Sequence, residues 1–221
     1  MIKATLFGAL LTCMITAYAQ EAETPLSRTI FKLSPQHFIH NSLKAGIEHF
    51  NEAHSSSAAF FVTGMLENKE YTFQGDGYSG IAGEVQFRKY ISPMKSYTSR
   101  HGKSYYQGVY GAAYLQGGYY SGDFKDAYSY YDPNTGGTVT QYQYDYNEKV
   151  TNGGFGFTIG YQKTLWQVIF LEAFVGGGVQ FADKTRSGIS PNADYYDYEG
   201  ITDPGYKGIL PKIGLHIGIG L

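Results

Sequence analysis

The chain has 221 residues, with 17 basic and 19 acidic side chains and a formal net charge of −2. Because these charges are nearly balanced and spread along the chain, we expect no nucleic-acid partner. The 29 glycines and 22 tyrosines, beside one tryptophan and one cysteine, are unlike the composition of an ordinary soluble α/β enzyme. They are typical of a membrane β-barrel, which uses small residues where its interior is crowded and tyrosine where a ring is wet at one end only.

The N-terminal sequence MIKATLFGALLTCMITAYAQ is organised like a secretory signal peptide. Lys3 provides a positive charge, an apolar stretch follows, and A-Y-A at 17–19 matches a cleavage site. We therefore expect a signal peptide over 1–19 and a short N-terminal segment over 20–27. The alternative is a lipoprotein signal with Cys13 as the lipidated residue, but a threonine precedes that cysteine and fits the pattern poorly.

The rest of the chain contains no stretch near the 18 or so consecutive apolar residues of a spanning helix, but segments of alternating apolar and polar residues recur. The alternating segments are 43–50, 56–66, 81–91, 105–120, 154–162, 168–181 and 207–221. In 105–120 both the odd-numbered and the even-numbered positions (the two parities) are apolar, so the sequence does not show which of them faces the lumen. The connections are alternately short and long, as in outer-membrane barrels, whose turns are short at one end and whose loops are long at the other.

Seven segments do not suit a bacterial single-chain barrel, which has an even number of strands. A long connection precedes the last segment, so counting back requires a further strand before 43–50. We assign it to 28–39, although Pro35 removes a ladder donor there. The prediction is an eight-stranded antiparallel up-and-down transmembrane β-barrel over 28–221, with ten strands as the alternative. Its external loops are expected near 67–79, 121–153 and 182–206.

The facing of the two parities distinguishes a membrane barrel from a soluble barrel of the lipocalin type. In the C-terminal IGLHIGIGL, for example, isoleucine and leucine alternate with glycine and His216. A soluble barrel would turn its apolar parity inward. Elsewhere the opposite parity holds glycine and glutamate, which make a poor apolar core, whereas glycine suits a narrow, crowded lumen. We therefore expect the apolar parity to face lipid, in the outer membrane of a Gram-negative cell envelope.

Charged and amide side chains lie on the parity that we expect to face the lumen. They are Lys44, Glu48, Glu84, Gln86, Arg88, Glu172, Gln180 and His216. An eight-stranded barrel is just wide enough inside for side chains, and an unpaired buried charge is costly. We predict that these groups pair and fill the lumen, with Arg88 between Glu84 and either Glu48 or Glu172. The alternative is a selective polar pathway, as in a small porin-like transport barrel for small or apolar solutes.

Two long connections are rich in tyrosine and aspartate and form a candidate external binding surface. The sequence DPNTGG at 132–137 predicts a turn, with polar strands continuing on both sides as a protruding hairpin. Tyrosines can stack on sugar faces, and carboxylates can bind sugar hydroxyls or Ca²⁺. The alternative is a solvated cap whose tyrosines form an interfacial girdle. The residues of this predicted surface are Tyr130, Tyr131, Asp132, Tyr144, Asp194, Tyr195, Tyr196, Asp197 and Tyr198.

Motifs of enzymes and of metal sites are missing from the sequence. The six histidines form no HExxH pair, and there is no GxSxG, Walker A or CxxC sequence. The glycine cluster at 176–178 lies inside an alternating strand with no helix after it, so it does not indicate a nucleotide site. We expect no catalytic residues, no cofactor and no metal; the alternative is an outer-membrane barrel enzyme whose site is assembled from distant strands.

Four segments carry a resemblance to a known family, namely 31–52, 77–92, 154–165 and the C-terminal IGLHIGIGL. They resemble small outer-membrane β-barrel proteins of bacteroidete-type bacteria, of the OmpX/OmpW-like size class. The resemblance implies a lumen-side glutamate, here Glu48, and an internal basic residue, here Arg88. Leu221 departs from it, since an aromatic residue is usual at this position. The resemblance implies no settled biochemical role.

The expected role is structural or interactive, through the external loops. We expect contacts with outer-membrane lipid and lipopolysaccharide, with the barrel assembly machinery, and with an extracellular glycan or protein ligand. We also expect a monomer.

Overall fold

The computed structural model describes residues 27–66, 77–91, 94–98, 104–133, 136–165, 168–188, 201 and 203–221. In this part of the chain, the strands are β1 (Thr29–Leu33), β2 (Ser42–Phe50), β3 (Ser56–Met65), β4 (Gly77–Tyr90), β5 (Lys95–Thr98), β6 (Ser104–Asp132), β7 (Gly137–Leu165), β8 (Ile169–Ser187) and β9 (Gly208–Gly220). One 3-10 helix, η1 (Pro35–His40), lies between β1 and β2. No helix among the described residues is both long and apolar enough to cross a membrane.

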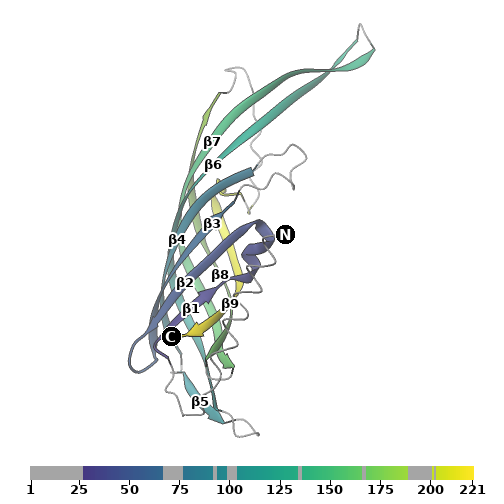
Figure 1. The fold of residues 1–221 in the computed structure, drawn as a ribbon. Helices are drawn as coiled ribbons and strands as arrows, with labels where there is room; N and C mark the ends of the chain where they lie inside the picture. The colour runs from purple at the N-terminus through teal and green to yellow at the C-terminus, as the bar shows by residue number, and fades with distance from the viewer. Residues whose placement is uncertain are drawn as a thin grey trace.

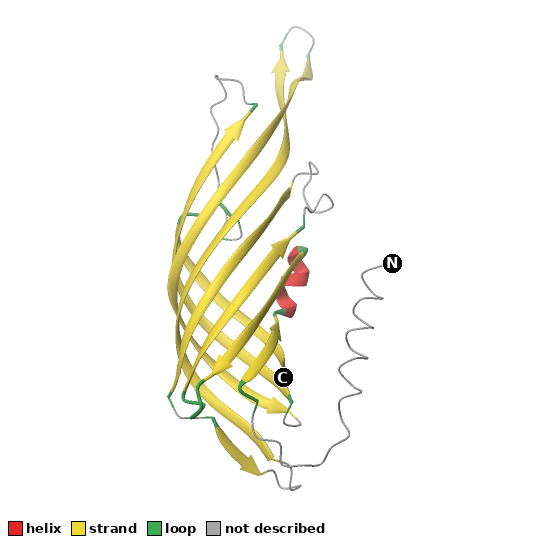
Figure 2. Cartoon of the chain, turned by 60° about the vertical axis from the view of Figure 1, so that its left-hand side comes forward, coloured by secondary structure: helices red, strands yellow, loops and turns green. Residues whose placement is uncertain are grey.

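Eight of these strands pair antiparallel and close into a ring, which confirms the predicted eight-stranded up-and-down fold. β1 to β4 pair in succession, β4 pairs with β6, β6 to β9 pair in succession, and β9 returns to β1 (Figures 1 and 2). β5 pairs with β6 alone among the described strands, in the connection 92–104 for which the sequence predicts only a turn. The ring therefore follows chain order, with β5 as a short addition beside the end of β4.

β1 is shorter than the predicted strand over 28–39. It ends at Leu33, and Pro35 begins η1 instead of continuing the ladder. Proline has no N–H for a neighbouring strand, and its fixed φ suits the first turn of a helix. Asn41 then ends η1 in the left-handed conformation, at φ 48°, and its N–H bonds the carbonyl of Phe38 at 3.3 Å. The chain reverses there into β2.

β6 and β7 are far longer than the alternating segments in the sequence indicate. Each has 29 residues, and their pairing runs to Asp132 opposite Gly137. Most of 121–153 is therefore strand, and Gly136 at φ 64° lies in the turn that joins the two strands. The hairpin projects beyond the other strands at one end of the ring (Figure 1). We call this the hairpin end, and the opposite end, where β2 turns into β3, the turn end.

Strand alternation sorts the side chains into an apolar outer face and a largely polar inner face. Phe157, Ile209 and Ile213 are 71%, 76% and 80% exposed, whereas Glu48, Gln86 and Arg88 are buried. The structure also resolves the facing of 105–120: Tyr110, Ala112 and Tyr114 point inward, and Val109, Leu115 and Tyr119 point outward. The inner parity of β6 thus brings tyrosines into the lumen.

Glycines on β7 and β8 make room for these tyrosines. A Cβ atom at Gly156 would collide with the backbone carbonyl of Gly177 and with the Tyr114 hydroxyl, and one at Gly160 would collide with the Tyr110 ring. The interior therefore accepts two large rings because the residues paired with them on the neighbouring strand β7 are glycines.

The contact between the first and last strands of the ring is short. β1 and β9 share four residue pairs, from Ile30 opposite Gly220 to Leu33 opposite Ile217. Above Ile217, the described part of β9 pairs only with β8, and η1 lies beside it in place of a longer β1 (Figure 2).

Pro211 lies on this unpaired side of β9. Leu221 donates its N–H to Thr29 of β1, and Gly220 donates to Val168 ahead of β8, each at 2.9 Å. The backbone N–H and C=O groups of odd-numbered residues in β9 therefore lie on the side of β1, and the register with β8 is unbroken along the strand. The N–H that Pro211 lacks would face the unpaired side, which is where proline is tolerated in a sheet.

Replacing glycine by alanine should change the stability differently on the crowded inner face and on the open outer face of the ring. Gly156→Ala should cost about 1–3 kcal/mol because the backbone of β8 blocks its Cβ. Gly111→Ala, which meets nothing within 4 Å, should be neutral or should stabilise by about 0.5–1 kcal/mol. Denaturant midpoints of the refolded variants measure both effects, and equal midpoints would contradict the described packing.

Candidate functional site

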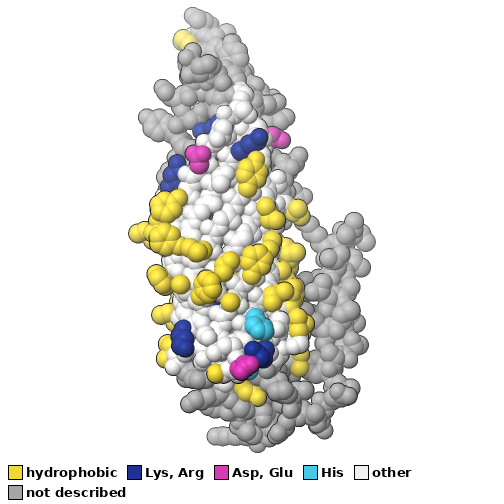
Figure 3. Space-filling model, turned by 90° about the vertical axis from the view of Figure 1, so that its left-hand side faces the viewer, with side chains coloured by type: hydrophobic (Ala, Val, Ile, Leu, Met, Phe, Trp, Pro, Cys, Tyr) yellow, Lys and Arg dark blue, Asp and Glu magenta, His cyan; other side chains and the backbone are white. Residues whose placement is uncertain are grey.

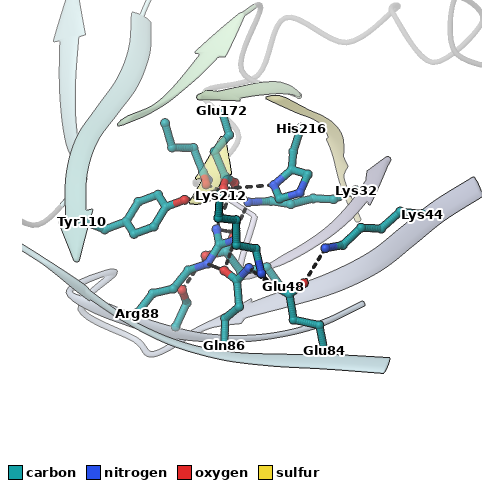
Figure 4. A network of polar contacts seen from close by, with 12 residues as sticks. Lys32, Lys44, Glu48, Glu84, Gln86, Arg88, Tyr110, Glu172, Lys212 and His216 are labelled. Atoms are coloured by element: carbon teal, nitrogen blue, oxygen red, sulfur yellow. Dashed lines mark hydrogen bonds and ion pairs between the residues drawn. The ribbon is translucent and has the colours of Figure 1, made fainter. Parts of the chain in front are cut away.

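Two cations and two carboxylates meet in the middle of the lumen. They are Lys32 of β1, Glu48 of β2, Arg88 of β4 and Glu172 of β8, and their side chains are at most 1% exposed. The Lys32 ammonium contacts both carboxylates. Nη1 of Arg88 lies 3.2 Å from Oε2 of Glu48 and 2.9 Å from Oε2 of Glu172. We call these four residues, which lie together in Figure 4, the central ion cluster. Its two positive and two negative formal charges cancel.

Two ring side chains, those of Tyr110 and His216, also contact Glu172. The Tyr110 hydroxyl donates to its Oε1 at 2.5 Å, and Nδ1 of His216 lies 3.0 Å from the same oxygen. The His216 ring is held between two aromatic rings, with centroids 4.7 Å from Phe61 and 4.8 Å from Phe174. Because every partner is itself packed, the carboxylate has a fixed position.

Glu48 and Lys32 have further partners of their own. The hydroxyls of Ser57 and Tyr90 donate to Oε1 of Glu48, the second at 3.3 Å. Lys32 donates to Oε1 of Gln162 at 2.8 Å. A buried charge is tolerated only when such bonds replace its lost hydration.

Gln86 joins the central ion cluster to a second group of charges. Arg88 donates to Oε1 of Gln86 through Nε at 2.8 Å and Nη2 at 2.6 Å, and Nε2 of Gln86 donates to Glu84 at 2.6 Å. Glu84 in turn binds Lys44 at 2.5 Å and Lys212 at 2.7 Å (Figure 4). We call Lys44, Glu84 and Lys212 the upper triad.

The predicted pairing of Arg88 is therefore half right. Arg88 bridges both Glu48 and Glu172, but the predicted bond to Glu84 is wrong. Residues two apart on a strand share a face, so Glu84, Gln86 and Arg88 form one row on β4. The side-chain amide of Gln86 lies between the other two and accepts the Arg88 hydrogen bonds on that side, and Lys44 and Lys212 bind the Glu84 carboxylate.

A third ionic group lies toward the hairpin end. Glu148 of β7 accepts hydrogen bonds from Nε of Arg186 and from the Tyr78 hydroxyl, and Lys184 lies 3.6 Å from it. The Phe124 ring is stacked on Tyr146 at 5.4 Å and packs edge-on against Tyr78 at 5.1 Å. These contacts support the base of the projecting hairpin.

Beneath the central ion cluster, apolar side chains close the turn end of the lumen. The buried cluster consists of Ile30, Phe50, Tyr90, Met94, Tyr110, Ala112 and Phe170. On the other side of the ions, toward the hairpin end, a cavity of about 140 Å³ remains. Its polar lining includes His37, Lys44, Glu84, Gln116, Asn152 and Gln180. The lumen is therefore packed at one end and hollow at the other.

The eight lumen residues singled out in the sequence all have buried side chains. Seven belong to the central ion cluster, the upper triad or their direct partners. Gln180 lies apart, where Nε2 of Gln116 donates to it at 3.2 Å and it donates to the backbone carbonyls of Pro204 and Tyr206. Lys212 donates to Gln116 at 3.4 Å, so this amide joins Gln180 to the upper triad, and the network reaches from β1 to β9.

Sequence reasoning missed several inward-facing polar residues, namely Lys32, Tyr90, Tyr110, Glu148, Gln162 and Lys212. Parity could have found Lys212, which is four residues before His216 on the same strand, and Gln162, which is two residues after Gly160. Lys32 lies in a strand of five residues, which is too short to show a periodicity. Tyr110 lies in the segment whose two parities are both apolar.

The predicted external surface is only partly covered by the described residues. The backbones of Tyr130, Tyr131 and Asp132 form the end of β6, and that of Tyr144 lies in β7, within the projecting hairpin. Asp194, Tyr195, Tyr196, Asp197 and Tyr198 lie outside the described residues.

The buried carboxylates Glu48, Glu84 and Glu172 bind cations of the protein itself. No group of three or more metal-ligating side chains suited to a metal ion occurs among the described residues. No protein-family model, curated protein or solved structure matches the chain. The family resemblance in the sequence stays a prediction.

Neutralising one member of the central ion cluster should destabilise the fold strongly. Glu172→Gln leaves Lys32 and Arg88 sharing one carboxylate, which should cost about 3–5 kcal/mol. Glu52→Gln serves as the control, because its pair with Arg28 is exposed and worth roughly 0–1 kcal/mol. Urea midpoints measure both. Adding Lys32→Met to Glu172→Gln should recover part of the loss by restoring the charge balance, and a further loss would contradict this reasoning.

Proposed function

We propose that this protein is an outer-membrane β-barrel whose lumen is closed by its own side chains and which presents the β6–β7 hairpin outside the cell. The observation that carries the proposal is an uncharged apolar belt around the barrel. On the outward-facing positions of 109–119 in β6, 151–161 in β7, 171–181 in β8 and 209–219 in β9, no residue is charged.

The height of this belt suits a bilayer. Each of the four stretches has 11 residues. At about 3.3 Å per residue and a tilt near 45°, such a stretch spans about 25 Å, which is the height of the apolar band of outer-membrane barrels. Soluble monomers rarely expose a contiguous apolar patch of more than a few hundred Å².

Charged residues border the belt on both sides. On the face shown in Figure 3, hydrophobic side chains gather across the middle and charged ones lie above and below them. Exposed charges at the turn end are Arg28, Glu52 and Lys89, and those toward the hairpin end are Asp123, Lys149, Asp183 and Lys207. This distribution matches two water-facing rims around a lipid-facing middle.

The packed interior favours a structural or surface-interaction role over a channel. The apolar cluster and the central ion cluster occupy successive levels of the lumen, so a solute would have to displace both. Among the described strands, those of the hairpin project farthest beyond the belt (Figure 1), and the base of the hairpin is held by the contacts of Glu148 and Phe124. A glycan or a protein is the ligand class that its tyrosine-rich strands suit.

Charged substitutions on the outer face test the membrane assignment. Val175 lies at the middle of the belt and is 58% exposed. In a lipid bilayer, Val175→Arg should lower the free energy of unfolding by about 2–4 kcal/mol. Asp183→Arg, at the rim of the same strand, should cost roughly 0–1 kcal/mol. Urea titrations of protein folded into lipid vesicles compare the two. A soluble protein would tolerate both equally, because exposed substitutions usually change stability by about 0.5 kcal/mol or less.

Two further measurements test the closed outer-membrane barrel. Protein from outer-membrane fractions should migrate differently on gels before and after heating, as a closed barrel does. In planar bilayers it should give no steady conductance. Recovery in a soluble periplasmic fraction would contradict the membrane assignment, and a steady conductance that changes in Arg88→Gln would favour the transport barrel instead.

A further inference from the structure

The cavity above the upper triad has an unbalanced charge at its floor. Lys44 and Lys212 share the single carboxylate of Glu84, which leaves one formal positive charge in excess. The central ion cluster is neutral in itself. Among the described residues toward the hairpin end, Glu148 and Asp203 pair with Lys184 and Arg186, two charges of each sign.

Lys44 is the lysine of the triad that has hydrogen-bond donors to offer. An ammonium has three N–H groups, and this one donates to Oε2 of Glu84 at 2.5 Å and stands 5.1 Å from the Phe61 ring centroid. Lys212 is more fully engaged, by Glu84 at 2.7 Å, by Gln116 at 3.4 Å and by the Tyr114 ring at 3.6 Å. The Lys44 side chain is 7% exposed and lines the cavity.

The size and lining of the cavity restrict what could balance this charge. A volume of about 140 Å³ equals roughly four or five water molecules at about 30 Å³ each. Asn152 and Gln180 already donate their amide hydrogens to backbone carbonyls at 2.9–3.3 Å. Lysine binds phosphate as a point charge, and a buried charge gains most from a compact partner of opposite sign.

We propose that this cavity binds a small oxyanion, a phosphate or carboxylate group, through the ammonium of Lys44. The group enters from the hairpin end, because the apolar cluster closes the turn end. A free anion and the head of an anionic lipid share this chemistry. The site requires a folded barrel but does not depend on the role of the hairpin.

Calorimetric titration of inorganic phosphate into the folded full-length protein, in neutral detergent at constant ionic strength, tests the site. Lys44→Gln should weaken binding about tenfold or more, since it removes a charged hydrogen bond. Lys149→Gln is the matched control, because it removes one exposed lysine from the same half of the barrel and should leave the affinity unchanged. Gel mobility of the same samples reports whether each variant is folded.

A second variant changes the affinity in the opposite direction. Glu84→Gln leaves both lysines without their carboxylate, so phosphate should bind about threefold tighter or more. Lys44→Arg keeps the charge and should retain binding. These two variants keep the test decisive if Lys44→Gln does not fold, and weaker binding by Glu84→Gln would overturn the assignment.

Parallel titrations with acetate and with dihexanoyl phosphatidate identify the source of the anion. Lys44-dependent binding of phosphate or acetate assigns a free oxyanion, and binding of the phosphatidate alone assigns a lipid head. Folded protein that binds none of the three, or binds them equally without the Lys44 charge, overturns the proposal while leaving the barrel assignment intact.

Discussion

Pairing of charges that are buried inside the ring is the constraint on which this structure depends. Lys32 and Arg88 reach Glu48 and Glu172 across the lumen, so four strands of the ring are joined through its centre as well as along its wall. Each charge also has hydroxyl or amide partners, which replace the hydration it has lost. A lumen filled in this way fixes the distance between opposite strands.

The same strand alternation that builds this interior builds the exterior. In a closed sheet every backbone group between paired strands is hydrogen-bonded, so the side chains alone decide whether each face suits a polar or an apolar environment. On β8, Glu172 and Gln180 point inward while Val175 and Val179 point outward. The reversal of the usual soluble pattern, with polar groups inside and apolar groups outside, follows from one choice of register repeated around the ring.

How much of this could be predicted depended on the length of each strand. Alternation in β2, β3 and β9 is regular enough to predict both their positions and the inward facing of Glu48 and His216. Two features escaped that reasoning for physical reasons. β1 has five residues and stops at a proline, so its one inward lysine is invisible to periodicity. The bridge of Arg88 to two carboxylates depends on cross-lumen distances that a single sequence does not contain, and Gln86 displaced Glu84 from it because it is nearer along the same strand.

The short contact between β1 and β9 has a consequence for how the wall comes apart. These two strands share four residue pairs, whereas β1 and β2 share five and the ladders between β6, β7 and β8 are far longer, so this is the shortest contact between described neighbours in the ring. We therefore expect fluctuations that open the ring to begin between β1 and β9. We also expect these two strands to pair last during folding. Pro211 has no N–H to offer on the unpaired side of β9. A strand from another chain that paired with this side would therefore lack one hydrogen bond.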